Sequence, residues 1–282
     1  MSLAGTGEIV GPAARAGRGV GAFNIIGIEH AEAIAAGAEA AGVPAVLQIS
    51  ENCVAYHGAL EPLAEAALAI ARSAGVPVAV HLDHARDEEL VHRAAAAGIG
   101  SVMFDASALP YARNVAMTRA VGAWCHARGL WVEAEIGEVG GKDGVHAPGA
   151  RTRPAEAASY AAATGADGLA VAVGSSHAML SRDAELDLGL IRRIRSAVAV
   201  PLVLHGSSGV PDGTLTAAVA AGMTKINLAT QLNKVYTAAV RGALAGDPAL
   251  VDPRRYGAAG GAAVAQEVTR LLGVLSAGPA AA

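Results

Sequence analysis

Aromatic residues, cysteines and long apolar runs are all scarce in this sequence, and each shortage excludes a class of protein. Aromatic residues make up only 3% of the chain, so a core must be built mainly from Ala, Val, Leu and Ile. The two cysteines, Cys53 and Cys125, are too few for a disulfide framework and fit a reducing compartment. Gly or a charged residue interrupts every apolar run before it reaches the roughly 20 residues of a membrane helix.

Charge is also sparse. Charged residues make up 16% of the sequence, the formal net charge is -4 and no basic run is present, which argues against nucleic acid as the main partner. The N-terminus lacks the basic region and apolar run of a secretory signal. We therefore expect a soluble cytoplasmic protein that binds neither nucleic acid nor a membrane.

What the sequence does contain is a regular alternation of strand-like runs and Ala-rich helical stretches. The strand-like runs are Gly19–Ile26, Ala45–Ser50, Val76–Leu82, Ser101–Asp105, Leu130–Ile136, Gly168–Val173, Val200–Leu204 and Thr224–Leu228. Eight strand–helix units in succession predict a single (β/α)8 TIM barrel over residues 1–282. We expect an N-terminal segment at 1–15, an extra C-terminal helix at Ala262–Ser276 and a frayed tail at 277–282.

An open, doubly wound sheet could hold as many strands. It would usually carry a Gly-rich dinucleotide-binding turn after the first strand, and the sequence A-F-N-I at Ala22–Ile25 offers none. The barrel is therefore favoured over the open sheet.

Polar residues stand at nearly every predicted strand end, where a barrel keeps its catalytic groups. His84, His177 and His205 follow three different strands and would meet at one face. A single histidine there would more often be a capping or surface residue, but three imidazoles with an open fourth position are typical of a catalytic zinc site. Cobalt, manganese or iron could occupy the same geometry.

The loop after the seventh strand reads G-S-S-G at Gly206–Gly209 and can present several backbone N–H groups to an anion. Asn227 of the eighth strand would lie beside this loop. Because barrels often bind phosphate between these two positions, the pattern indicates a phosphate site next to the histidines.

Seven short motifs in this order resemble those of the class II, zinc-dependent fructose-bisphosphate and tagatose-bisphosphate aldolases, from roughly Gly19 to Gly257. They are A-F-N-I at 22–25, H-L-D-H at 81–84, S-V-M-F-D-A-S at 101–107, V-E-A-E-I-G at 132–137, D-G-L-A-V-A-V-G-S-S-H at 167–177, V-L-H-G-S-S-G at 203–209 and K-I-N at 225–227.

The resemblance implies that the three histidines bind a catalytic Zn²⁺ and that Asp83 is the general base for the C4 hydroxyl. Asp105 and Glu135 match family acids near the metal, where a second divalent or monovalent cation is found. The residues implied for substrate and phosphate binding are Asn24, Ser50, Ala178, Gly206, Ser208, Asn227 and Thr230.

The chain departs from the family pattern at two places. Ala178 and Ser181 stand where the family commonly has the Gly and Lys that serve phosphate, and Arg182 is one residue further on. In the loop after Gly141, Asp143 is the only candidate for the second acid or base, where the family often has two or three acids.

The sequence thus predicts a metal-dependent aldehyde-lyase that splits a ketose 1,6-bisphosphate, foremost fructose 1,6-bisphosphate, into dihydroxyacetone phosphate and an aldehyde such as glyceraldehyde 3-phosphate. Tagatose bisphosphate or another ketose 1-phosphate is an alternative substrate, and a metal-binding barrel without catalysis is an alternative function. The family resemblance also implies a homodimer or homotetramer.

Overall fold

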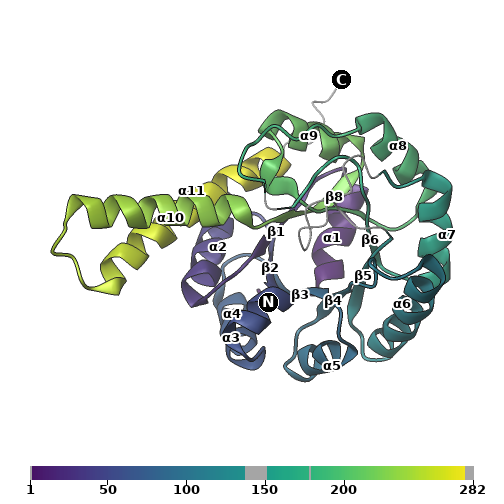
Figure 1. The fold of residues 1–282 in the computed structure, drawn as a ribbon, viewed down its shortest axis with the longest axis horizontal. Helices are drawn as coiled ribbons and strands as arrows, with labels where there is room; N and C mark the ends of the chain where they lie inside the picture. Colours follow the sequence, from purple (N-terminus) through teal and green to yellow (C-terminus); the bar gives the residue numbers. More distant parts are fainter. Residues whose placement is uncertain (1, 137–150, 178, 277–282) are drawn as a thin grey trace.

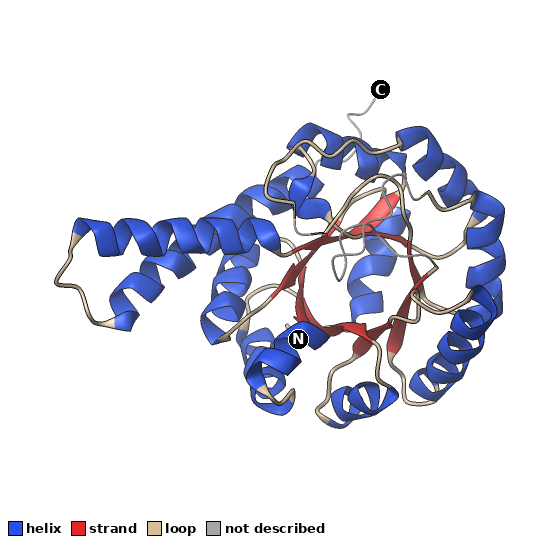
Figure 2. Ribbon diagram, viewed as in Figure 1, coloured by secondary structure: helices blue, strands red, loops and turns tan. Residues whose placement is uncertain are grey.

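The computed structural model describes residues 2–136, 151–177 and 179–276 of the chain. Eight parallel strands pair in chain order, and the first pairs with the last, so the sheet closes on itself. Figure 2 shows these strands as a ring with helices packed around it. The predicted TIM barrel with a helix at its C-terminal end is confirmed.

The strands largely follow the predicted runs. They are β1 (Val20–Asn24), β2 (Ala45–Ser50), β3 (Val78–Ala85), β4 (Ser101–Phe104), β5 (Trp131–Glu135), β6 (Gly168–Ala170), β7 (Leu202–Leu204) and β8 (Met223–Leu228). Most are shorter than predicted, but β3 continues past the predicted end at Leu82 as far as Ala85.

The helices on the outside of the ring begin and end at recognisable signals. They are α2 (Ile28–Ala41), α3 (Glu51–His57), α4 (Glu61–Ser73), α5 (Glu88–Ala96), α6 (Tyr111–His126), α7 (Pro154–Thr164), α8 (Leu188–Ala197) and α9 (Asp212–Ala221), with a short 3-10 turn, η1 (Ser207–Gly209). Asp87 and Asp187 cap α5 and α8 by accepting backbone N–H bonds, and Gly165 ends α7 in the left-handed conformation. Within the described residues, no helix is long and apolar enough to span a membrane.

A helix that the sequence did not predict, α1 (Thr6–Arg15), fills the barrel at the amino-terminal ends of the strands. Its buried Ile9 and Val10 pack against Val20, Val46 and other inward-facing residues of the first strands. The larger apolar core lies between the strands and the outer helices. Because α1 closes the amino-terminal end, the carboxyl ends of the strands remain as the open mouth of the barrel.

The last two helices, α10 (Thr230–Gly246) and α11 (Pro253–Ser276), form an antiparallel hairpin that projects beyond the barrel (Figure 1). We call this hairpin the arm. The C-terminal helix begins at Pro253 rather than at the predicted Ala262, and Asp252 accepts a bond from the backbone N–H of Arg254 at its start. Along α10 only Leu232 is buried, so most of that helix faces outward.

Candidate metal centre and active site

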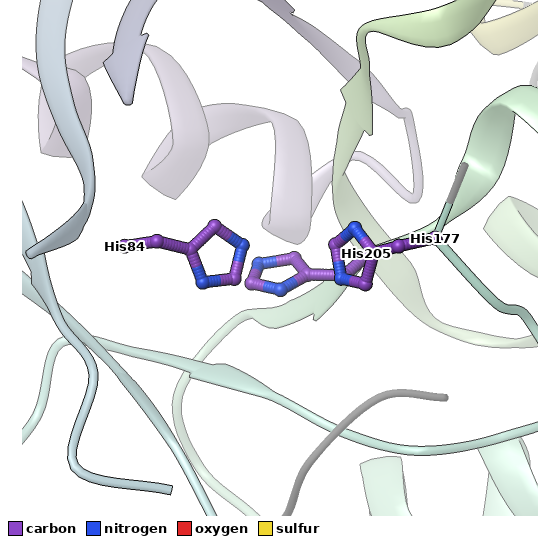
Figure 3. A group of neighbouring side chains, drawn as sticks. All are labelled: His84, His177 and His205. Carbon is purple, nitrogen blue, oxygen red and sulfur yellow. The ribbon is translucent and has the colours of Figure 1, made fainter. Parts of the chain in front are cut away.

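Three histidine rings meet at the carboxyl ends of the strands, as Figure 3 shows. His84 lies in β3, His177 in the loop after β6 and His205 directly after β7. Their ring centroids are 4.7 to 5.8 Å apart, and one nitrogen from each lies within 4.8 Å of the others. The three predicted ligands are therefore close enough together to hold one metal ion.

The backbone of β3 explains how neighbouring residues both reach this centre. In a regular strand successive side chains point to opposite faces, so Asp83 and His84 would diverge. The pairing of β3 with β4 shifts register between Leu82 and Ala85, and His84 has a φ of 54°. Such a bulge re-aims a side chain, and a non-glycine residue rarely adopts this φ. The irregularity turns His84 inward beside Asp83.

His205 has the properties of a metal ligand. Its ring is fully buried, and its Nε2 lies 2.9 Å from Glu133 Oε1. Its Nδ1 has no hydrogen-bond partner among the described residues. Burial, and then the neighbouring His84, hold the pKa of His205 well below its usual value. The ring is therefore neutral with a lone pair turned toward the centre, as a metal ion requires.

The two predicted acids lie next to His84. Its Nδ1 is 2.7 Å from Asp105 Oδ2 and 4.0 Å from Glu135 Oε2. Asp105 and Glu135, together with His84, form a second group whose ligand atoms could hold a cation. The short contact to Asp105 also fits a carboxylate that orients the imidazole while its other nitrogen faces a metal.

Asp83 is buried between two amides. Its carboxylate accepts bonds from Asn24 Nδ2 at 2.9 Å and Asn227 Nδ2 at 3.4 Å. Burial opposes ionisation, yet the pKa of Asp83 falls to about 2 because His84 and Lys225 lie near the carboxylate. Asp83 is thus ionised at neutral pH and able to accept a proton.

A cavity of about 170 Å³ opens beside Asp83 and the histidines. It is lined by the predicted substrate residues Asn24, Ser50, Gly206, Ser208, Asn227 and Thr230, and by Asn52, Ser176, Ser207 and Ala229. Ala178 lies outside the described residues. Asn52, Ser176 and Ala229 were not predicted as site residues, and their only sequence signal is their position one or two residues from a predicted one.

The loop after β7 packs tightly against the loop after β6 and the start of α10. Gly206 adopts a φ of 67°, and a Cβ there would lie 2.5 Å from the carbonyl oxygen of Ser176, so only glycine fits. Ser208 Oγ accepts bonds from the backbone N–H groups of Ala229 and Gln231 and so ties this loop to the start of α10. These contacts hold the polar walls of the cavity together.

The residues at the departures from the family pattern are engaged elsewhere. The Arg182 guanidinium donates to the Val210 carbonyl at 2.7 Å and to Asp212 at 2.6 Å. The Ser181 hydroxyl donates to Asp183. The predicted second acid or base, Asp143, lies outside the described residues.

Comparison with known proteins identifies the family of this chain. The family model for class II fructose-bisphosphate aldolase matches residues 4–278. The fructose-bisphosphate aldolase of Geobacillus stearothermophilus is 39% identical over 259 residues, which are 90% of each chain. The YdjI aldolase of Escherichia coli K12 is 29% identical, with a TM-score of 0.86 over 98% of each chain. The fructose-bisphosphate aldolase of Campylobacter jejuni, 20% identical with a TM-score of 0.80 over 95% of this chain and 93% of its own, shares the fold. The chain belongs to the class II fructose-bisphosphate aldolase family.

Proposed function

We propose that this aldolase is a cytoplasmic, zinc-dependent enzyme that reversibly cleaves fructose 1,6-bisphosphate into dihydroxyacetone phosphate and glyceraldehyde 3-phosphate, a glycolytic reaction. The observation that carries the proposal is the buried, ionised Asp83 beside three converging histidines. The Geobacillus relative, named fructose-bisphosphate aldolase, supports the choice of substrate.

The residues present fit a metal ion. His205 directs a buried ring nitrogen without a hydrogen-bond partner among the described residues toward His84 and His177. Imidazole ligands suit zinc, and the two nearby carboxylates could hold a second cation. When bound, the ion supplies Lewis-acid polarisation of the ketose C2 carbonyl.

The chain itself supplies proton transfer and orientation. Asp83 takes the proton of the C4 hydroxyl in cleavage and returns it in condensation. As the C3–C4 bond breaks, its electron pair moves toward the C2 carbonyl, and C3 then takes up a proton, for which Asp143 is the candidate donor. Gly206, Ser208, Asn227 and Thr230, with the Ala178 backbone N–H, would hold the dihydroxyacetone phosphate end, and Asn24 and Ser50 the other end.

A second candidate substrate is tagatose bisphosphate or another ketose 1-phosphate. The observation that favours a ketose 1-phosphate, which carries one phosphate fewer, is that Ser181 stands where the family commonly has a phosphate-binding lysine, together with the ion pair that engages Arg182 with Asp212. A less phosphorylated substrate would not need that lysine.

A coupled cleavage assay on fructose 1,6-bisphosphate, with chelator and with zinc added back, tests the proposal. We expect activity that the chelator abolishes and zinc restores. Faster turnover of tagatose bisphosphate or a ketose 1-phosphate would select the second candidate. Tight zinc binding without cleavage of any of these substrates would indicate a metal-binding barrel without catalysis.

We also propose that the protein is a homo-oligomer, a dimer or tetramer, in which the arm packs on a second copy. Leu244 and Val251 of the arm are 40% and 86% exposed. An apolar groove of about 580 Å³ runs between α2 and α11, and its charged lining residues are Glu29, Glu32 and Arg254. Light scattering after gel filtration should give at least twice the monomer mass, and Val251→Asp should lower it.

A further inference from the structure

Beneath the metal centre, inside the barrel, lies a fully buried ion pair that the proposed reaction does not use. Lys225 Nζ is 2.8 Å from Glu133 Oε2, and both side chains are 0% exposed. Burying two charges costs free energy that their attraction recovers only when further hydrogen bonds satisfy them. Each member of this pair does have a second partner.

Through these second partners the ion pair is connected both to a candidate metal ligand and to the candidate base. Glu133 Oε1 lies 2.9 Å from Nε2 of the metal-ligand candidate His205. Lys225 Nζ donates to Asn227 Oδ1 at 2.8 Å, and Asn227 Nδ2 donates to Asp83. One ion pair therefore contacts a candidate ligand directly and the candidate base through a single amide.

We propose that the Glu133–Lys225 ion pair is the positioning element that couples the metal centre to the base. It fixes the His205 ring with Nδ1 facing the metal, and it fixes Asn227 with its NH₂ group facing Asp83. The inference rests on the proposed function in two respects, the bound metal ion and the role of Asp83 as the base.

The donor and acceptor chemistry of the groups imposes both orientations. A carboxylate only accepts, so His205 carries its proton on Nε2 and leaves Nδ1 for a metal. An ammonium only donates, so the oxygen of the Asn227 amide must face Lys225 and its nitrogen must face Asp83. An uncharged pair of the same size would allow the His205 ring or the Asn227 amide to turn round.

The first test uses the wild-type, zinc-loaded protein with ¹⁵N-labelled histidine. Nuclear magnetic resonance should show His205 protonated at Nε2 and metal-bound through Nδ1. A His205 ring protonated at Nδ1 would overturn the proposal. No variant is needed, so a folding defect cannot obscure the answer.

The second test uses Glu133→Gln, Lys225→Met and the double variant, with Ser101→Ala as the matched control. Glu133→Gln should weaken metal binding about 10- to 100-fold in competition with a chelator and alter the Co²⁺ absorption spectrum. Lys225→Met should lower kcat about 10- to 100-fold at saturating metal with a smaller change in metal affinity.

The double variant separates positioning from charge balance within the pair, because neither Glu133 nor Lys225 is left buried without the other. We expect it to fold and to show both losses. A double variant with wild-type metal affinity and kcat would mean that the two charges only neutralise each other, and the proposal would fail.

The control Ser101→Ala removes an equally buried polar group of the barrel interior that contacts neither His205 nor Asp83. It should keep metal affinity and kcat, and equal losses in it would contradict a specific role of the ion pair. If the wild type cleaves no sugar phosphate, the proposed function fails, while the resonance and metal-affinity measurements still decide the role of Glu133.

Discussion

The barrel interior holds the same residue types at two depths, with different surroundings. At the mouth, His84 and Glu135 lie beside the candidate metal position. One layer deeper on the same strands, His81 and Glu133 are fully buried, with His81 Nδ1 bonded to Ser101 and Glu133 paired with Lys225. We call these the mouth layer and the interior layer.

The comparison shows that depth and local backbone, not residue type, separate a candidate ligand from a structural histidine. His81 follows the regular alternation of β3 and faces inward, whereas His84 faces inward only because of the bulge. Burial, and then Lys225, hold the pKa of His81 well below its usual value, so this ring is a neutral part of the core. The motif H-L-D-H contains both His81 and His84, so the family resemblance alone does not distinguish the two histidines.

The largest predicted effect comes from substituting the two histidines of β3 separately. His84→Ala should remove the bound metal and lower kcat/KM about 1,000-fold or more, because the metal stabilises the transition state by several kcal/mol. His81→Ala should retain the metal but lower the free energy of unfolding by about 2–4 kcal/mol through a cavity and lost hydrogen bonds.

Metal content, kcat/KM and thermal unfolding should be measured on both variants. Retention of metal by His84→Ala, or its loss in folded His81→Ala, would break the distinction between the two layers. His92→Ala, at a part-exposed residue of α5 that stacks on Trp124, is the control and should change neither metal content nor kcat/KM.

The second prediction concerns the base. Asp83→Asn should lower kcat about 10²- to 10⁴-fold while zinc binding persists, because the amide keeps the shape of the side chain but cannot accept the C4 hydroxyl proton. The measurement is steady-state cleavage with metal content determined on the same sample. Full zinc occupancy with unchanged kcat would exclude Asp83 from the chemistry.

Much of the fold could be predicted because each strand is a short apolar run bounded by turn residues, and β2 begins and ends at the predicted residues. The cluster of histidines at the mouth could also be predicted, since parallel strands place their carboxyl ends together. The ion pair of Glu133 with Lys225 inside the barrel is a contact that the structure adds. The roles of the site residues stay predictions.

Other features depend on contacts that a single sequence does not display. The bulge in β3 exists only relative to the register of β4. Helix α1 is a short segment whose apolar residues are buried only because they pack into the amino-terminal end of the barrel. The arm has no apolar face pointed at the barrel along most of α10, so its position follows from packing of α11 on α2 and α10.

The third prediction extends the comparison outward to the rim of the mouth, where Arg182 is paired with Asp212. Because that pairing occupies the guanidinium, Arg182→Leu should raise KM for fructose 1,6-bisphosphate less than about threefold, the scale of a weak, partly solvated ion contact. Ser181→Lys is the matched gain-of-charge variant and should lower KM. A tenfold rise in KM for Arg182→Leu would show that arginine does replace the missing lysine.

The smallest predicted effect is the pH dependence of the same rim cluster. Burial opposes ionisation of Asp212, but bonds from Arg182 and Arg270 lower its pKa below the usual value. A lowered folded-state pKa stabilises the protein above the unfolded pKa of about 3.9, and this stabilisation is lost as the pH falls through the folded value.

Asp212→Asn should therefore reduce the free energy of unfolding by less than about 1 kcal/mol near neutral pH, and the difference from wild type should shrink toward pH 3. Thermal unfolding of both proteins at several pH values measures this difference, and high salt should reduce it because these side chains are partly exposed.

In contrast to the rim, the interior ion pair of Glu133 and Lys225 is fully buried, so salt should leave its contribution to the free energy of unfolding nearly unchanged. Equal salt sensitivity of Asp212→Asn and Glu133→Gln would mean that water reaches the interior layer.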